Sequence, residues 1–258
     1  MRVGLGRGAL EIKQFLRSRE SVVFTLLFPV ALVVIFGAIF QRDLAPGVTF
    51  TQYFVTGMIA AGLLVTGFQT LAIQIPIERD KGVLKRLRGT PMPSSAYFVG
   101  KVVMVLVIGI AETVVLLAIA VAFYGVTLPG SAGRWVTFGW VAVLGITACT
   151  LSGIAFSSLA RTGRGAPAMV TPVALILQFV SGVFYVFTEL PAWMQQFAAL
   201  FPLKWMCQGM RSVFLPATYA ANEAAGSWEL GRVALVLAAW CVGGLALCLL
   251  TFRWTPPD

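Results

Sequence analysis

The chain has 258 residues, of which 59% are hydrophobic and 11% are charged, and its formal net charge is +9. Soluble globular domains carry about 25% charged residues, so this composition argues against a soluble protein and indicates a membrane-embedded one. A membrane-spanning helix needs roughly 20 apolar residues. The chain therefore has room for about six spans and for no sizeable soluble domain.

The sequence lacks the residues and motifs that several kinds of chemistry require. It contains no His, so a His-based metal site, proton relay or catalytic triad cannot be built. We expect neither a metal finger nor a disulfide framework from the spacing of Cys149, Cys207, Cys241 and Cys248. No P-loop and no dinucleotide-binding glycine motif is present. The chain is therefore not expected to be an enzyme or to hydrolyse nucleotide itself.

Residues 1–21 are basic, with five Lys or Arg residues. Leu5, Ala9, Ile12 and Leu16 recur at helical spacing, which predicts an amphipathic helix lying on the cytoplasmic membrane surface. A solvated basic tail is the alternative. A signal peptide is not predicted, because the apolar run starts late.

The rest of the chain predicts an all-α integral membrane protein. Six apolar segments are expected to span the membrane: 22–40, 53–77, 97–124, 135–159, 166–187 and 233–252. The connection 188–232 is unusually apolar for a loop and contains Trp193 and Trp205. It predicts two short helices that dip into the outer leaflet or lie on it, with Trp anchors at the headgroups.

The distribution of basic residues predicts the orientation. With six spans, one side of the membrane holds 14 of the 19 Lys and Arg residues, in segments 1–21 and 78–101, at Arg161 and Arg164, and at Arg253. The other side holds five: Arg42, Arg134, Lys204, Arg211 and Arg232. The positive-inside rule then places both termini in the cytoplasm. This pattern also accounts for the net charge of +9 without a nucleic-acid partner.

A charged segment, 78–93, reads ERDKGVLKRLRGTPMP and holds five of the Lys and Arg residues and two of the 10 acids. The stretch 78–88 predicts about three helical turns with a narrow apolar stripe of Val83, Leu84 and Leu87. Such a helix fits a groove on a cytoplasmic protein. The alternative is a loop that only sets the topology.

Four polar residues lie within predicted spans: Glu112, Gln69, Gln74 and Gln178. A mid-span carboxylate is costly and typically faces a cavity or a partner. Glu112 either binds a cationic substrate or is protonated and hydrogen-bonded within the chain. The glutamines either line the same path or form interhelical hydrogen bonds.

The charged segment resembles the one that follows the second span in ABC type-2 (ABC-2) transporter permeases, a family of drug, lipid and polysaccharide exporters. The family's acid–Arg–acid cluster, Gly, Leu, basic pair, Leu and small-residue–Pro turn are matched by Glu78, Arg79, Asp80, Gly82, Leu84, Lys85, Arg86, Leu87, Thr90 and Pro91. Phe201-Pro202-Leu203, followed by Arg211, is similar to the family's C-terminal signature. The resemblance covers essentially the whole chain, and the branch of the daunorubicin-resistance permeases fits best by size and pattern.

The resemblance implies the permease subunit of an ATP-driven exporter of drugs, lipids or other amphipathic compounds in a bacterial plasma membrane. The permease would form a homodimer or heterodimer with two separate cytoplasmic ATPase subunits. ATP and Mg would be bound by those ATPases and no cofactor by this chain. By family analogy the ATPase-coupling residues are Glu78, Arg79, Asp80, Gly82, Val83, Leu84 and Leu87.

Two other functions compete with this interpretation. An ion- or proton-coupled secondary carrier would use Glu112, but carriers need several intramembrane ionisable residues and the spans contain this single one. An integral-membrane enzyme would need a cluster of reactive side chains at the interface, and no cluster of His, Asp or Cys supports it.

Overall fold

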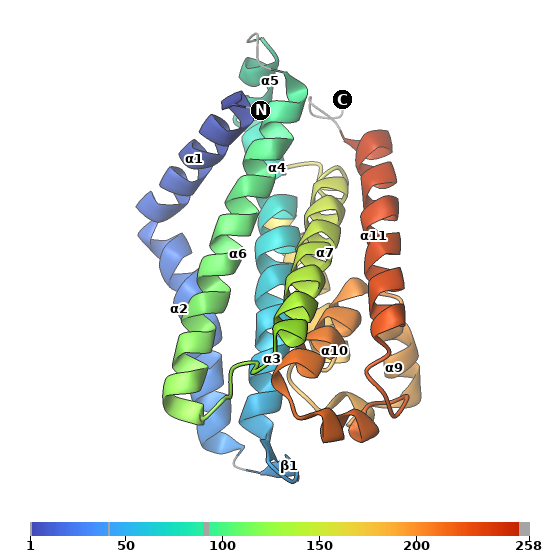
Figure 1. The fold of residues 1–258 in the computed structure, drawn as a ribbon. Coiled ribbons are helices and arrows are strands. Elements are labelled where there is room, and N and C mark those ends of the chain that lie inside the picture. Colours follow the sequence, from blue (N-terminus) through green and yellow to red (C-terminus); the bar gives the residue numbers. More distant parts are fainter. Residues whose placement is uncertain (1, 41, 90–92, 253–258) are drawn as a thin grey trace.

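The computed structural model describes residues 2–40, 42–89 and 93–252. Figure 1 shows a bundle of long helices in which α1, α5 and the end of α11 lie at one end, and β1, α9 and α10 at the other. The first half of the chain consists of α1 (Arg2–Arg17), α2 (Arg19–Ile39), β1 (Asp43–Ala45), β2 (Val48–Thr49), α3 (Phe50–Leu64), η1 (Val65–Gln69), α4 (Thr70–Asp80), α5 (Val83–Arg88) and α6 (Ser94–Tyr124). The second half consists of α7 (Ala132–Phe156), α8 (Ala166–Val180), η2 (Phe187–Glu189), α9 (Ala192–Ala199), α10 (Pro202–Phe214), η3 (Ala217–Asn222) and α11 (Leu230–Thr251).

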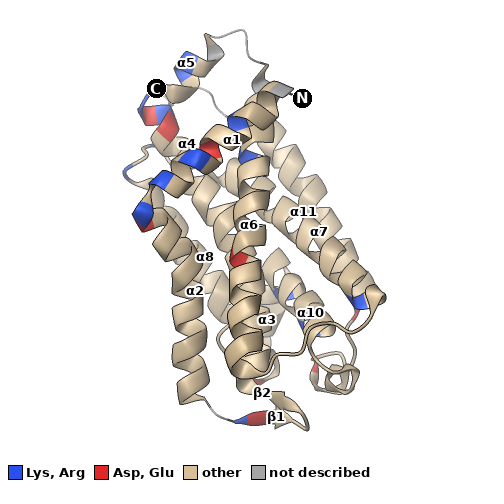
Figure 2. Ribbon diagram, turned by 60° about the vertical axis from the view of Figure 1, so that its left-hand side comes forward, with Lys and Arg blue, Asp and Glu red and all other residues tan. Residues whose placement is uncertain are grey.

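Charge is concentrated at the two ends of this bundle. Figure 2 shows blue and red segments gathered around α1, α4 and α5 and again near β1 and α10, with the long helices between them almost uncharged. Five helical stretches are long and apolar enough to cross a membrane: α2, the continuous run from α3 to α4, α6, α7 and α11. The structure is therefore mostly helical and consistent with an all-α integral membrane protein, and the five helical stretches begin and end within a few residues of predicted spans.

The predicted fifth span, 166–187, is the exception. Helix α8 ends at Val180, so its 15 residues extend only about 22 Å, less than the ~30 Å hydrocarbon core. Gly182 adopts a left-handed conformation with φ of 76°, which turns the chain away from the helix axis. Non-helical residues 181–186 follow, and Val183, Phe184 and Val186 among them pack into the bundle. The prediction of one span over 166–187 is therefore wrong in its second part, where the chain is not helical.

Helix α1 packs along α6 through its small residues. A Cβ at Gly4 would lie 2.8 Å from Val99 Cγ1, and one at Gly8 would lie 2.7 Å from Val103 Cγ1. The glycines thereby let the two helix backbones approach closely. Leu5 and Leu16 of the predicted apolar stripe remain exposed. These leucines therefore stay available to a membrane surface, while Ile12 packs against the core and the neighbouring glycine face attaches α1 to the bundle.

The innermost helix runs from α3 through η1 to α4. Its start is set by a capping box, in which Thr49 Oγ1 accepts a hydrogen bond from Gln52 N at 3.2 Å and Gln52 Oε1 accepts one from Thr49 N at 3.0 Å. Its middle contains a π-helical turn, η1, a feature that frequently marks functional sites. It ends at Asp80, three residues later than predicted. The acidic start of the charged segment therefore belongs to this helix.

The connection 188–232 forms the end of the bundle near β1. Two short helices, α9 and α10, are present as predicted. However, almost every residue of α10 is buried, because this helix packs between α3, α7 and α11. Trp205 is buried as well, whereas Trp193 is exposed. The prediction that Trp205 anchors the chain at the headgroups is therefore wrong, and the depth of the two helices in the outer leaflet stays a prediction.

Candidate functional site

A buried ionic cluster joins three helices at the α5 end of the bundle. Lys101 Nζ on α6 lies 2.5 Å from Glu78 Oε1 on α4 and 3.0 Å from Glu11 Oε2 on α1. Tyr97 donates a hydrogen bond to Glu78 Oε2 at 2.9 Å, and Arg7 lies 2.6 Å from Glu11 Oε1. The Lys101 side chain is fully buried. Glu78 is thus engaged inside the chain, where it ties the end of α4 to α6 and α1.

Arg79 and Asp80 attach the same helix end to the loop between α7 and α8. Arg79 donates a hydrogen bond to the Ala160 carbonyl, and Asp80 Oδ2 accepts one from Gly163 N at 2.5 Å. Gly163 also lies against the backbone of Ile77, where a Cβ would be 2.6 Å from Ile77 Cα. The acid–Arg–acid cluster is therefore a clamp between chain segments. In this conformation Glu78 and Asp80 are engaged within the chain rather than free to latch onto a partner.

The predicted three-turn helix 78–88 is broken. Gly82 has φ of 69°, which separates α4 from α5. Leu84 is fully buried and Leu87 packs against the core, so the apolar stripe faces this chain. The exposed positions are Lys81, Lys85 and Arg86, giving α5 a basic outer face. Thr90 and Pro91 of the predicted turn lie outside the described residues.

A cavity of about 680 Å³ lies between α2, α3–η1, α6 and α8. It brings together three of the four polar residues singled out within the spans: Glu112, Gln69 and Gln178. Gln69 Nε2 donates a hydrogen bond to Thr171 Oγ1 at 3.3 Å across to α8. Gln74 is half-buried on α4 and does not line this cavity.

Glu112 is held by the π-helical region of the innermost helix. Thr66 Oγ1 donates a hydrogen bond to Glu112 Oε2 at 2.8 Å. The carboxylate fits against Gly62, where a Cβ would clash with Glu112 Oε1. Gly62 therefore provides the space, and Thr66 one turn later provides the donor.

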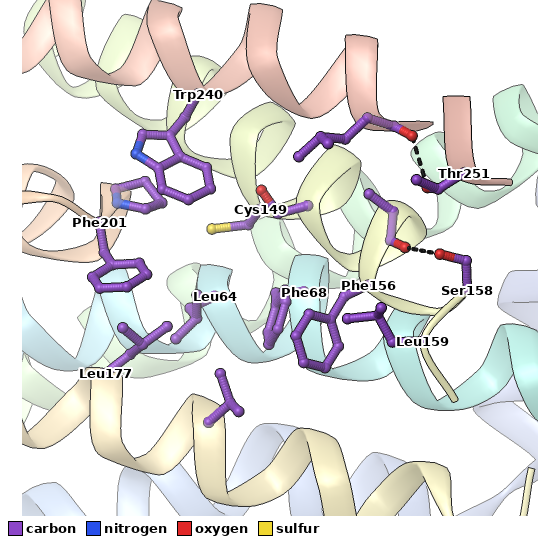
Figure 3. A pocket seen from close by; sticks show the side chains of 15 residues that line it. Leu64, Phe68, Cys149, Phe156, Ser158, Leu159, Leu177, Phe201, Trp240 and Thr251 are labelled. Carbon is purple, nitrogen blue, oxygen red and sulfur yellow. Dashed lines mark hydrogen bonds between the residues drawn. The ribbon is translucent and has the colours of Figure 1, made fainter. Parts of the chain in front are cut away.

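A second, smaller cavity of about 320 Å³ lies between η1, α7, α8 and α11, and Figure 3 shows its lining. Its walls are mainly Phe68, Phe156, Leu177 and Trp240. The hydroxyls at its rim are already bonded within their own helices, such as Thr251 Oγ1 to the Leu247 carbonyl at 2.7 Å. This cavity therefore offers apolar surface and no free polar group for catalysis or ligand orientation.

The end of the bundle near β1 contains buried charges, Lys204 and Arg211, in the connection that the sequence analysis placed on the outer side of the membrane. Arg211 forms two bonds with Glu223, at 2.5 and 3.0 Å, and its guanidinium lies 4.9 Å from the centre of the Tyr53 ring. Lys204 lies 3.5 Å from the centre of the Trp205 ring. The missed signal was the spacing of Lys204, Gln208 and Arg211 at i, i+4 and i+7, which places them on one face of α10.

Burial lowers the pKa of Lys204 to about 8. The native protein therefore releases this proton at a lower pH than the unfolded chain, whose lysine pKa is about 10.4. Below pH 8 both states hold the proton, and between about pH 8 and 10.4 the unfolded state holds more protons. We expect stability to rise with pH in this window by more in the wild type than in Lys204→Met. Thermal unfolding at pH 7.5 and pH 9.5 checks this, and equal pH slopes for the two proteins contradict it.

Comparison with known proteins agrees with this architecture. The family model for ABC-2 type transporters matches residues 9–215. The inner membrane transport permease YadH of Escherichia coli (strain K12) is 25% identical over 213 residues, which cover 80% of each chain. YvfS of Bacillus subtilis (strain 168), named a transport permease, is 22% identical over 226 residues, covering 86% of this chain and 82% of the relative.

A third relative carries a more specific name. The "Probable multidrug ABC transporter permease YbhR" of Escherichia coli (strain K12) is 22% identical over 174 residues, covering 66% of this chain and 45% of the relative. The family match spans most of the bundle, from α1 to the end of α10. The chain therefore belongs to the ABC-2 type transporter family and is a multi-pass membrane transport permease.

Proposed function

We propose that this chain is the membrane-spanning subunit of an ATP-driven exporter of amphipathic compounds in a bacterial inner membrane, with both termini in the cytoplasm. ATP and Mg are bound and ATP is hydrolysed by a separate cytoplasmic ATPase. The basic residues of α1, α4 and α5 support this orientation, since they gather at one end of the bundle. The name of the relative YbhR supports a multidrug substrate range.

The observation that carries the proposal is the cavity next to Glu112. It has the volume of a drug-sized site and is lined by α2 and α8. Phe24, Phe28 and Tyr185 line it and are nevertheless at least half exposed. The cavity is therefore open on one side, and an equivalent face of a second permease subunit would enclose it. This supports a dimer with the substrate path at or near the contact between its subunits.

The ionic cluster around Lys101 supports coupling at the α5 end. It connects α4 to α1 and α6, and the Arg79–Asp80 clamp connects α4 to the loop before α8. A force applied to α5 is therefore passed to helices that line the cavity. The coupling residues act from within the chain, and the outer face of α5 meets the ATPase.

The proposal is tested by capturing the full-length permease with its ATPase and placing the complex in proteoliposomes. We expect uptake of a fluorescent amphipathic dye into inside-out vesicles that requires ATP and stops with vanadate. The permease alone is expected to hydrolyse no ATP. Uptake that is lost when the proton gradient collapses, while ATP remains high, would instead support the secondary carrier using Glu112.

The outer face of α5 allows a test of coupling that spares the fold. Lys85→Glu with Arg86→Glu reverses two exposed charges. We expect roughly tenfold slower ATP-dependent transport, because the new carboxylates would repel the acidic side chains that a basic α5 face is expected to meet on the ATPase. Lys13→Glu with Arg17→Glu, on exposed positions of α1, is the matched control. Transport by the α5 variant at the rate of the wild type would exclude this face as the contact with the ATPase.

A further inference from the structure

Glu112 differs from the other buried acids of the protein. Three carboxylates are buried in the described part of the chain: Glu11 and Glu112, each 4% exposed, and Glu223, 6% exposed. Glu11 pairs with Arg7 and Lys101, and Glu223 pairs with Arg211. Glu112 forms no salt bridge with any described residue, and its single hydrogen bond comes from a neutral hydroxyl, Thr66. The fold thus neutralises two buried acids with its own cations and leaves the third without one.

The position of Glu112 is built for access from the cavity. Gly62 leaves room for the carboxylate, and Thr66 holds Oε2 at 2.8 Å. Oε1 receives no hydrogen bond from the residues that the structure describes, and Glu112 lines the cavity of about 680 Å³. Since a carboxylate in an apolar membrane interior is costly without a partner, this arrangement favours a ligand that supplies the opposite charge.

The walls of the same cavity favour a cation that is also hydrophobic. No Lys or Arg lines the cavity, whereas six aromatic residues do: Phe24, Phe28, Phe36, Phe179, Phe184 and Tyr185. Aromatic rings present a negative face that attracts cations, more strongly when water is excluded. The remaining polar groups, from Thr25, Gln69, Thr171 and Gln178, carry no net charge. The cavity therefore combines one carboxylate, aromatic walls and no competing positive charge.

We propose that this cavity binds hydrophobic organic cations, with Glu112 as the counter-charge and the aromatic residues of α2, α8 and the segment 181–186 as the walls. The proposal rests on the proposed export function, because it names the substrate class of that same path. Glu112 is then the residue that determines charge selectivity, and Gly62 and Thr66 are its positioning residues.

Two ions of matched size and shape test the proposal: tetraphenylphosphonium, a cation, and tetraphenylborate, an anion. Equilibrium binding to the purified full-length permease in nanodiscs of neutral lipid needs neither ATP nor the ATPase. We expect the wild type to bind the cation at least about tenfold more tightly than the anion, a ratio that corresponds to about 1.4 kcal/mol. Equal affinities for the two ions overturn the proposal, and this comparison needs no variant.

Substitutions then locate the charge selectivity. Glu112→Gln is expected to lose the preference for the cation, whereas Glu112→Asp retains part of it. Gly62→Ala is expected to weaken cation binding because the added methyl group displaces the carboxylate. Glu189→Gln is the matched control, because this carboxylate is exposed and pairs with Arg42 at the β1 end. A cation preference in Glu112→Gln as large as in the wild type and in Glu189→Gln overturns the role of Glu112.

The binding assay also separates this inference from the proposed function. ATP-dependent export of a neutral amphipathic dye together with failure to prefer the cation would refute the cation site and leave the exporter intact. A clear cation preference in a protein that shows no ATP-dependent transport would refute the exporter and leave the site intact.

Discussion

Replacing Lys101 with Met is expected to lower the free energy of unfolding by about 3 kcal/mol, because it leaves two carboxylates of a buried cluster without their shared cation. The value lies at the lower end of the range for broken buried pairs. Arg7 still contacts Glu11, and the Glu78 side chain remains 18% exposed. Unfolding in mixed micelles of increasing denaturing-detergent content, followed by circular dichroism, measures the change.

Two further variants separate the ionic cluster from a general effect of losing a lysine. Lys85→Met removes an exposed lysine of α5 and is expected to leave stability almost unchanged. Lys101→Met combined with Glu11→Gln and Glu78→Gln removes all three charges, and most of the lost stability should return. Equal stability of Lys101→Met and Lys85→Met would contradict the assignment of this cluster as the joint between α1, α4 and α6.

Replacing Arg211 with Met is expected to have a larger effect, about 4 kcal/mol, because it leaves Glu223 buried and without a cation. Arg211 is fully buried and Glu223 almost so, and the pair attaches α10 to the chain just after η3. The variant also loses the contact of the guanidinium with the Tyr53 ring. We therefore expect faster protease cleavage in the segment between α10 and α11, in addition to the lower stability.

Arg232 provides the matched control for this prediction. It pairs with Glu229 at 2.5 Å, but its side chain is 71% exposed, and exposed ion pairs contribute little. Arg232→Met should therefore unfold and be cleaved like the wild type. Adding Glu223→Gln to Arg211→Met removes the stranded charge and should restore part of the stability. A normal cleavage pattern in Arg211→Met would show that the pair does not hold this end of the bundle together.

The helical membrane fold could be predicted from the sequence because apolar length is a local property. A run of about 20 apolar residues spans a bilayer whatever surrounds it, and five such helical stretches are present. The segment 166–187 is not one spanning helix, because its apolar residues are divided between a short helix, α8, and the turn at Gly182. The apolar composition of a segment indicates that it avoids water. It does not show whether the segment is helical, because non-helical chain is also tolerated where neighbouring helices cover it.

The sequence predicted which residues belong to the candidate site, and it did not predict which groups each of them contacts. The sequence alone identified Glu112, Gln69 and Gln178 as polar residues within apolar segments, because charge and polarity are read directly from the chain. Their meeting in one cavity was decided by the tertiary structure, which brings α2, α6 and α8 around η1. The same holds for Glu78, which the sequence singled out as a coupling residue and which the tertiary structure pairs with Lys101.

The sequence by itself therefore determined that the protein is embedded in a membrane, that it is helical, that one end carries most of the basic residues, and to which family it belongs. These properties depend on composition and local order. Only the tertiary structure decided which acids are neutralised within the chain. Ion pairing depends on distances of a few ångströms between helices that are far apart in sequence, and no local pattern encodes those distances. Glu11 and Glu223 meet cations of the chain, and Glu112 meets a cavity.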